Sequence, residues 1–312
     1  MLSHAEALES ILGRLAPGHS HRKFLEVELY QTLAGKRGES RLQSRFKEFY
    51  LDGEFHVLWD VNLSIGSWKV QMDGLLLTEK CALIIESKNI SGKIHFDEKT
   101  GEFYRFDDEN VKTVMEDPRI QLNKNKRFLA QWFKSKKINL PIEGLIVFTA
   151  KKCEFISKPA DAYICKAYQM ADCLLKILST FPFEATNLKL LKLKKLLQNS
   201  QTPYRQTPLC QYYYIEPADV KPGVYCRSCK LLTMQRDKRS WTCNKCGERD
   251  KEAHHFAIRE YFSLIDTQLT NQRLRDFCRF SSRAAASRLL AQFDLETTGE
   301  LKSRVYFLKK KE

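Results

Sequence analysis

The sequence predicts a mixed α/β fold: an α/β sandwich, then a small cysteine-rich module, then a helical C-terminal domain. Three observations support this prediction. Short segments between residues 54 and 106 alternate apolar and polar side chains as strands do, helix-like segments lie on both sides of them, and two CxxC pairs follow later in the chain. A chain of 312 residues is long enough for two average domains and a third small one.

The expected sandwich begins with a helix over residues 40–50, after a loop favoured by Gly35 and Gly38. Its remaining elements, in chain order, are strands over residues 54–63, 69–78, 81–89, 93–96 and 103–106, a helix over 117–132 and a strand over 141–149. A helix, a strand meander, a second helix and a buried strand together form an α/β sandwich of about 150 residues.

The rest of the chain continues with helices over residues 171–178 and 184–198, and then with a linker over 200–222 that contains four prolines. The expected domains are an N-terminal helical segment over 1–35, the sandwich over 36–170, helices and linker over 171–222, the cysteine module over 223–250 and the C-terminal domain over 251–312.

The charge of the chain predicts a polyanionic partner. The formal net charge is +14, of which residues 1–170 carry +3 and residues 171–312 carry +11. A basic excess of this kind is typical of nucleic-acid binding, although it also describes a well-solvated surface. Hydrophobic residues at 43% exclude general disorder, and no apolar run reaches the ~20 residues that span a bilayer. Because Glu6 and Glu9 interrupt any signal-peptide core, we expect a soluble, cytoplasmic protein without a membrane partner.

Two carboxyl groups and a lysine are expected to meet on neighbouring strands. Glu86 and Lys88 leave the same face of their strand, and a short turn before that strand can bring Asp73 opposite Glu86. Two carboxylates within about 5 Å are costly in an apolar sheet unless a divalent cation neutralises them. Asp73, Glu86 and the carbonyl of Ser87 are candidate ligands of Mg²⁺ (or Mn²⁺). Lys88 can orient or help deprotonate a water, although solvated charges at strand ends are the alternative.

Several pieces of the chain between residues 36 and 150 match a known family in order and spacing. They are Gly38-Glu39, Met72-Asp73-Gly74, Ile85-Glu86-Ser87-Lys88-Asn89 followed by Gly92, Asp117-Pro118-Arg119-Ile120-Gln121, and the strand over 142–148. This region resembles the nuclease-related domain (NERD) group of the PD-(D/E)xK nuclease superfamily. The resemblance implies a metal-dependent nuclease whose catalytic residues are Glu39, Asp73, Glu86, Lys88 and Gln121. Glu39 is also explained as a helix N-terminal acid, and Gln121 as a surface residue.

Four of the ten cysteines form two CxxC pairs separated by 13 residues, at Cys226, Cys229, Cys243 and Cys246. This spacing predicts one structural Zn²⁺ held by four thiolates, with a redox CxxC pair as the alternative. His254 and His255 are further candidate ligands, but four cysteines already complete the site. Basic residues around the pairs, interleaved with an aromatic ring, are candidate nucleic-acid contacts, namely Arg227, Lys230, Arg236, Arg239 and Trp241. For the ring, a place in the small core is the alternative.

The last 60 residues resemble a winged helix-turn-helix in their pattern. A capped helix over residues 270–277 is followed by a turn and a second helix over 283–293, and residues 295–308 can form a hairpin through Gly299. The side chains expected to contact nucleic acid are Arg283, Ser287, Arg288 and Arg304. A plain protein-docking domain is the alternative.

These observations predict a Mg²⁺-dependent nuclease that hydrolyses phosphodiester bonds of DNA, with the zinc and helix-turn-helix modules holding the nucleic acid. One alternative is a non-catalytic DNA-binding regulator, or a replication or repair accessory protein, on a nuclease-like scaffold. Another is a zinc-mediated protein adaptor. Nucleases of this superfamily often act as two copies, which leaves a homodimer open.

Overall fold

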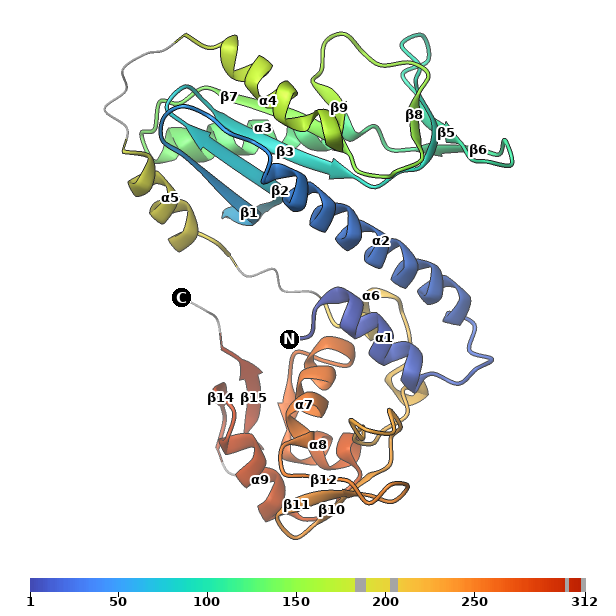
Figure 1. Ribbon diagram of the computed structural model, residues 1–312. Coiled ribbons are helices and arrows are strands. Elements are labelled where there is room, and N and C mark those ends of the chain that lie inside the picture. Colours follow the sequence, from blue (N-terminus) through green and yellow to red (C-terminus); the bar gives the residue numbers. More distant parts are fainter. Residues whose placement is uncertain (183–188, 203–206, 301–302, 310–312) are drawn as a thin grey trace. The chain divides into compact units, whose positions relative to one another are not determined.

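The computed structural model describes residues 1–182, 189–202, 207–300 and 303–309, and it divides into two compact units (Figure 1). Unit 1 combines residues 1–33 with residues 205–312, and unit 2 consists of residues 34–204. Helix α2 (Arg22–Phe46) contributes residues to both. This division differs from the five expected domains, because the N-terminal segment shares a core with the C-terminal part of the chain.

Unit 2 is built on a five-stranded mixed sheet with the order β1-β2-β3-β7-β9. Its strands are β1 (Phe55–Ile65), β2 (Trp68–Thr78), β3 (Ala82–Lys88), β7 (Ile142–Phe148) and β9 (Ile164–Lys166). The first three are antiparallel because short turns connect them, whereas β7 is parallel to β3 because helix α3 (Pro118–Ser135) lies in the crossover. The predicted sandwich of sheet and helices is therefore confirmed.

Both faces of this sheet are covered. Helix α3 and helix α5 (Leu190–Asn199) pack on one face, and the C-terminal part of α2 and helix α4 (Met170–Ser179) pack on the other (Figure 1). Burial on both sides explains why residues 82–86 are almost all apolar. Glu86 is the exception in this run, and it is as buried as its neighbours.

A second, four-stranded sheet in unit 2 has the order β6-β5-β4-β8. Its strands are β4 (Gly92–Phe96), β5 (Phe103–Phe106), β6 (Lys112–Met115) and β8 (Cys153–Phe155). The hairpin of β4 and β5 agrees with the prediction. Strands β6, β8 and β9 were not predicted, because each is only three or four residues long and β6 is largely exposed.

The predicted loop before residue 40 is wrong, because α2 runs without interruption through Gly35 and Gly38. A Cβ atom on Gly38 would lie 2.7 Å from Oγ1 of Thr149 and 2.8 Å from Cβ of Asn89. The glycine therefore permits a close approach between helix and sheet. The helix predicted over 184–198 is seen as α5, and its residues 184–188 lie outside the described part of the chain.

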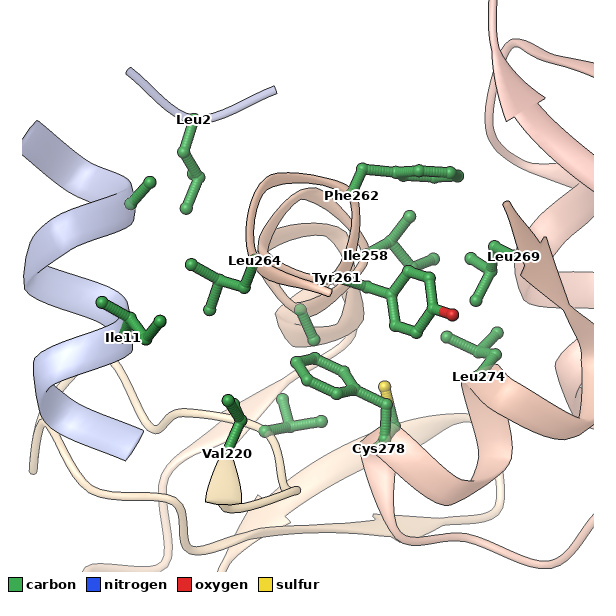
Figure 2. Close-up of a cluster of buried hydrophobic side chains, with 14 of the residues drawn as sticks. Leu2, Ile11, Val220, Ile258, Tyr261, Phe262, Leu264, Leu269, Leu274 and Cys278 are labelled. Carbon is green, nitrogen blue, oxygen red and sulfur yellow. The ribbon is translucent and has the colours of Figure 1, made fainter. Parts of the chain in front are cut away.

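Unit 1 surrounds helix α7 (Ala253–Leu264) with apolar side chains from distant parts of the chain (Figure 2). Helix α1 (His4–Arg14) contributes Ile11, and the segment before the cysteine module contributes Val220. The expected linker over residues 200–222 is therefore wrong for its described C-terminal part. Its prolines separate short turns, and the apolar residues between them are buried, namely Leu209, Cys210, Tyr213, Ile215 and Val220.

The remaining elements of unit 1 follow the predicted order. A three-stranded sheet comprises β10 (Met234–Asp237), β11 (Ser240–Cys243) and β12 (Arg249–Asp250). After α7 come β13 (Leu269–Thr270), α8 (Asn271–Cys278), α9 (Arg283–Ala291), β14 (Leu295–Thr298) and β15 (Val305–Leu308). The last sheet has the order β13-β15-β14, so the hairpin of β14 and β15 lies beside the two helices.

A fully buried ion pair connects α1 to α7. Nη2 of Arg14 lies 2.6 Å from Oε2 of Glu260, and Nε of Arg14 donates to Oε1 of the same carboxylate at 3.0 Å. Further hydrogen bonds from Arg14 reach the carbonyls of Lys221 at 2.7 Å and Gly223 at 3.1 Å. Because each of the three guanidinium nitrogens has an acceptor and Glu260 carries the opposite charge, the buried charge is compensated.

Candidate functional site

Asp73, Glu86 and Lys88, which we call the acid–lysine centre, lie where strands β2 and β3 stop pairing. The antiparallel ladder ends at the pair Gly74 and Ile85. Beyond this point, Oδ2 of Asp73 accepts hydrogen bonds from the backbone N–H and the hydroxyl of Ser87, both at 2.8 Å. The carboxylate of Asp73 thus accepts the backbone hydrogen bond of Ser87 that a carbonyl of the neighbouring strand would otherwise accept. These bonds hold Asp73 next to Glu86.

Glu86 carries the most perturbed carboxyl group of the centre. Its side chain is 2% exposed, and its Oε1 accepts a hydrogen bond from Nζ of Lys88 at 2.9 Å. Its Oε2 is buried and has no hydrogen-bond partner among the described residues. Burial, and next the negative charge of Asp73, raise the pKa of Glu86 to about 7. Lys88 therefore compensates the carboxyl group through only one of its two oxygens.

Lys88 is held between the sheet and helix α3. Its Nζ donates to Oε1 of Gln121 at 2.6 Å as well as to Glu86. Gln121 lies in the first turn of α3, where the side chain of Asp117 caps the helix by accepting from N of Arg119 at 2.8 Å. The structure thus brings together four of the five predicted catalytic residues, and it gives Gln121 a contact that a plain surface residue would lack.

Glu39 is the fifth predicted residue, and it approaches the centre from helix α2. It is half-buried, and its pKa is raised by burial and next by the negative charges of Asp73 and Asp60. It lies well inside α2, so its interpretation as a helix N-terminal acid is wrong.

The sequence interpretation missed Asp60, which lies on β1 between Trp59, the partner of Gly74, and Val61, the partner of Met72, where the pairing with β2 is interrupted. Its backbone is left-handed, with φ 51°, and its Oδ1 accepts from the side chains of Asn62 and Gln71. A signal existed, because an acid inside the strand pattern of residues 54–63 falls opposite Asp73 once the hairpin is drawn.

The acid–lysine centre suits one divalent cation. Glu39, Asp73 and Glu86 do not form a compact group of three acids among the described residues, so they do not share one ion as a closed cage. Asp73 and Glu86 remain as an adjacent pair, and the buried, unpaired Oε2 of Glu86 is an orphan that a cation would satisfy. The ligand role expected of the Ser87 carbonyl remains a prediction.

The four cysteines of unit 1 are arranged as a tetrahedral metal site. Their sulfur atoms all lie within 4.8 Å of one another, with Cys226 to Cys246 and Cys229 to Cys243 both at 3.7 Å. A tetrahedron with Zn–S bonds of about 2.3 Å has edges of about 3.8 Å. The residues therefore fit a structural Zn²⁺. His254 instead accepts from Nε1 of Trp241 at 3.3 Å and takes no part in the cluster.

Both cysteine pairs use the same turn. Backbone N–H groups of Lys245 and Cys246 point at the sulfur of Cys243, at 3.3 and 3.5 Å. The residue after each pair has a left-handed backbone, with φ 58° at Lys230 and 76° at Gly247. Gly247 suits this conformation because it has no Cβ atom, whereas Lys230 adopts it without the freedom of glycine.

The stacking role expected of Trp241 is wrong, because its side chain is completely buried. Its ring contacts Phe280 and lies beneath the guanidinium of Arg236, 5.3 Å from the ring centre. Burial, and next the charge of Arg288, lower the pKa of Arg236. The other expected contacts in this module are exposed, and these are Arg227, Lys230 and Arg239; of them, Arg227 pairs with Asp250 at 3.4 Å.

The C-terminal side chains divide between two surfaces. Arg283, Ser287 and Arg304 line one cavity of about 1100 Å³ between α8, α9 and the β14–β15 hairpin. Arg288 does not line it, and its charge acts on Arg236 instead. All four are exposed, so each is accessible to a partner.

Comparison with known proteins identifies one region of the chain. Residues 34–149 match the family described as the nuclease-related domain (NERD). No curated protein and no solved structure matches the chain significantly. Among the described residues, no helix combines the length and the apolar character needed to cross a membrane. The matched residues contain strands β1, β2, β3 and β7 of the five-stranded sheet, helix α3 and the whole acid–lysine centre. Residues 34–149 are therefore a nuclease-related domain.

Proposed function

We propose that this protein is a metal-dependent nuclease that hydrolyses phosphodiester bonds of DNA. The observation that carries the proposal is the environment of Glu86, where a buried carboxylate oxygen without a partner lies beside Asp73 and Lys88. A purely structural role for these residues would leave this buried oxygen unsatisfied in the core, which costs stability. A site for a divalent cation and a phosphate removes that cost.

In this mechanism Asp73 and Glu86 hold Mg²⁺ or Mn²⁺. The cation supplies Lewis-acid stabilisation of the phosphoryl oxygens and lowers the pKa of a bound water. Lys88 is kept in one orientation by Glu86 and Gln121, and its ammonium group stabilises the negative charge that develops at the phosphorus. Ser87 keeps the Asp73 carboxylate in place through two hydrogen bonds. Glu39 raises the local negative charge that favours a cation.

The C-terminal half is proposed to hold the nucleic acid. The order α7-β13-α8-α9-β14-β15, with the sheet β13-β15-β14, supports a winged helix-turn-helix in which α9 is the recognition helix. Arg236 supports anion binding through its charge, which lies over Trp241 and close to the charge of the exposed Arg288. The four-cysteine site supports a structural Zn²⁺ that keeps Arg236 and its neighbours on a rigid ribbon.

The test is cleavage of plasmid and single-stranded DNA with Mg²⁺ or Mn²⁺ by the wild type, Asp73→Ala and Lys88→Ala. Loss of at least about 100-fold in rate is expected in both variants, because each removes a group that acts on the reacting phosphate. Binding of DNA in EDTA should remain, since the arginines of unit 1 are unchanged. Wild-type cleavage rates in both variants would remove the acid–lysine centre from the mechanism.

A further inference from the structure

Unit 2 contains a second concentration of functional side chains, in a cavity close to the acid–lysine centre. The cavity has a volume of about 290 Å³ and lies between helix α2, the end of β7 and the end of β9. Four cationic residues line it, together with a threonine and a tyrosine, and no acidic residue does. The six are Arg41, Arg45, Lys151, Lys166, Thr149 and Tyr168, and we call the site the basic cavity.

Most of the positive charge in the basic cavity is not neutralised. The guanidinium of Arg41 donates to Oδ1 of Asn89 at 3.0 Å and to the carbonyl of Thr149 at 3.1 Å, and both acceptors are neutral. Among the described residues, neither Lys151 nor Lys166 forms an ion pair, and the ammonium of Lys166 lies 6.0 Å from the ring centre of Phe155. Arg45 does pair with a carboxylate, that of the exposed Glu48. Clustered cations without acids repel one another, and an oxyanion between them relieves this repulsion.

Thr149 acts at the cavity through its backbone, because its carbonyl holds the guanidinium of Arg41 at 3.1 Å. Its hydroxyl is buried against Gly38 of α2 and offers no accessible surface to a ligand. Tyr168 adds an aromatic ring that is 63% exposed, and exposed rings of this kind stack on nucleic-acid bases.

The basic cavity is directly connected to the acid–lysine centre. N–H of Thr149 donates to the carbonyl of Lys88 at 2.9 Å. Lys88, Phe148 and Lys166 are register partners on three adjacent parallel strands. Two strand spacings separate Lys166 from Lys88, or about 10 Å. A strand held at the acid–lysine centre can therefore place a nearby phosphate at the basic cavity.

We propose that the basic cavity binds a phosphate group of the nucleic-acid strand that the acid–lysine centre cuts, close to the scissile bond. This inference rests on the proposed nuclease function and adds to it a subsite that fixes the strand. The phosphate is either internal to the strand or a terminal 5′-phosphate. Both sources offer the same oxyanion chemistry, and the substrates below distinguish them.

The first test measures cleavage kinetics of the full chain carrying Lys151→Gln and Lys166→Gln together. The matched control carries Lys99→Gln and Lys134→Gln, which removes the same charge from exposed positions outside the cavity. We expect KM to rise at least about tenfold in the cavity variant, because a charge-assisted contact to phosphate is lost. The kcat value and the melting temperature should stay close to wild type, as in the control.

The substrates are circular plasmid and linear duplexes with 5′-phosphate or 5′-hydroxyl ends. An increase in KM on all three indicates an internal phosphate, and an increase confined to 5′-phosphorylated ends indicates a terminal one. Equal KM values for the cavity variant and the control on every substrate would overturn the proposal.

The second test does not depend on cleavage. Lysine acylation is followed by mass spectrometry in EDTA, with and without a 20-nucleotide duplex of each end type. Protection of Lys151 and Lys166, but not of Lys99 and Lys134, supports the basic cavity even in a protein that does not cut DNA. If the wild type cleaves DNA but Lys151 and Lys166 are not protected, the proposed nuclease function is retained and the proposed phosphate subsite is wrong.

Discussion

Glu86 is a charged residue in the run of residues 82–86, which is otherwise apolar because both faces of the sheet are buried. Residues 82–85 are buried and apolar, and Glu86 continues the run with a carboxylate that bonds through only one of its oxygens. The sequence alone predicted its pairing with Lys88 and Asp73, because strand periodicity fixes which side chains share a face. The orphaned oxygen could not be predicted, since it depends on the packing of α3 against the sheet.

Gln121 is expected to act through Lys88, whose ammonium it holds at 2.6 Å. Gln121→Ala should therefore lower kcat by about 10- to 100-fold, the usual effect of losing a group that orients a functional side chain. Lys88→Ala should lower it further. The double variant should be no slower than Lys88→Ala alone, because the two residues form one unit. Steady-state kinetics on plasmid DNA measure all three, and additive losses would mean that Gln121 acts independently of Lys88.

Helix α2 is the element that the sequence described least accurately. Gly35 and Gly38 favour a loop when only the sequence is considered. The structure shows instead that both lie in the helix and that only one of them contacts the sheet. Gly38 is pressed against Thr149 and Asn89, whereas a Cβ atom on Gly35 would meet nothing within 4 Å. The packing of α2 on the sheet therefore requires a glycine at position 38, whereas the space around position 35 would also accommodate a larger residue. Contacts between a helix and a distant strand are not visible in local sequence patterns.

This difference gives a paired prediction. Gly35→Ala should raise the free energy of unfolding by about 0.5–1 kcal/mol, because alanine loses less backbone entropy in a helix. Gly38→Ala should lower it by about 1–3 kcal/mol, because the added methyl group overpacks the contact with the sheet. Urea denaturation of the two variants tests this. Stabilisation by Gly38→Ala would show that α2 does not approach the sheet as closely as described.

The division into two units changes how the charge of the whole molecule is understood. Divided at residue 170, the basic excess lies mainly in the C-terminal part. Divided by unit, residues 1–33 and 205–312 contain 24 Lys and Arg against 17 Asp and Glu, and residues 34–204 contain 28 against 21. Both units therefore carry a formal charge of +7. The sequence could not predict this, because it gives no sign that residues 1–33 fold with the C-terminal part.

Arg14 provides a test of this division. Arg14→Met removes one partner of the buried pair with Glu260 and leaves an uncompensated carboxylate in the core of unit 1. We expect unit 1 to lose about 3–5 kcal/mol of stability. Unit 2 should unfold at its wild-type temperature, because it has its own core. Calorimetry of the full chain should show one shifted and one unchanged transition. A single transition that shifts as a whole would contradict independent units.

The measurement that tests the central claim most directly is cleavage of supercoiled plasmid by the wild type and by Glu86→Gln, with Glu154→Gln, an exposed glutamate on β8, as the matched control. Glu86→Gln keeps the shape of the side chain and removes the charge that a cation requires. We predict nicking or linearisation that needs Mg²⁺ or Mn²⁺, that is retained in the control and that is absent in Glu86→Gln. Equal cleavage by all three proteins, or DNA binding without cleavage by any of them, would contradict a nuclease centred on Glu86.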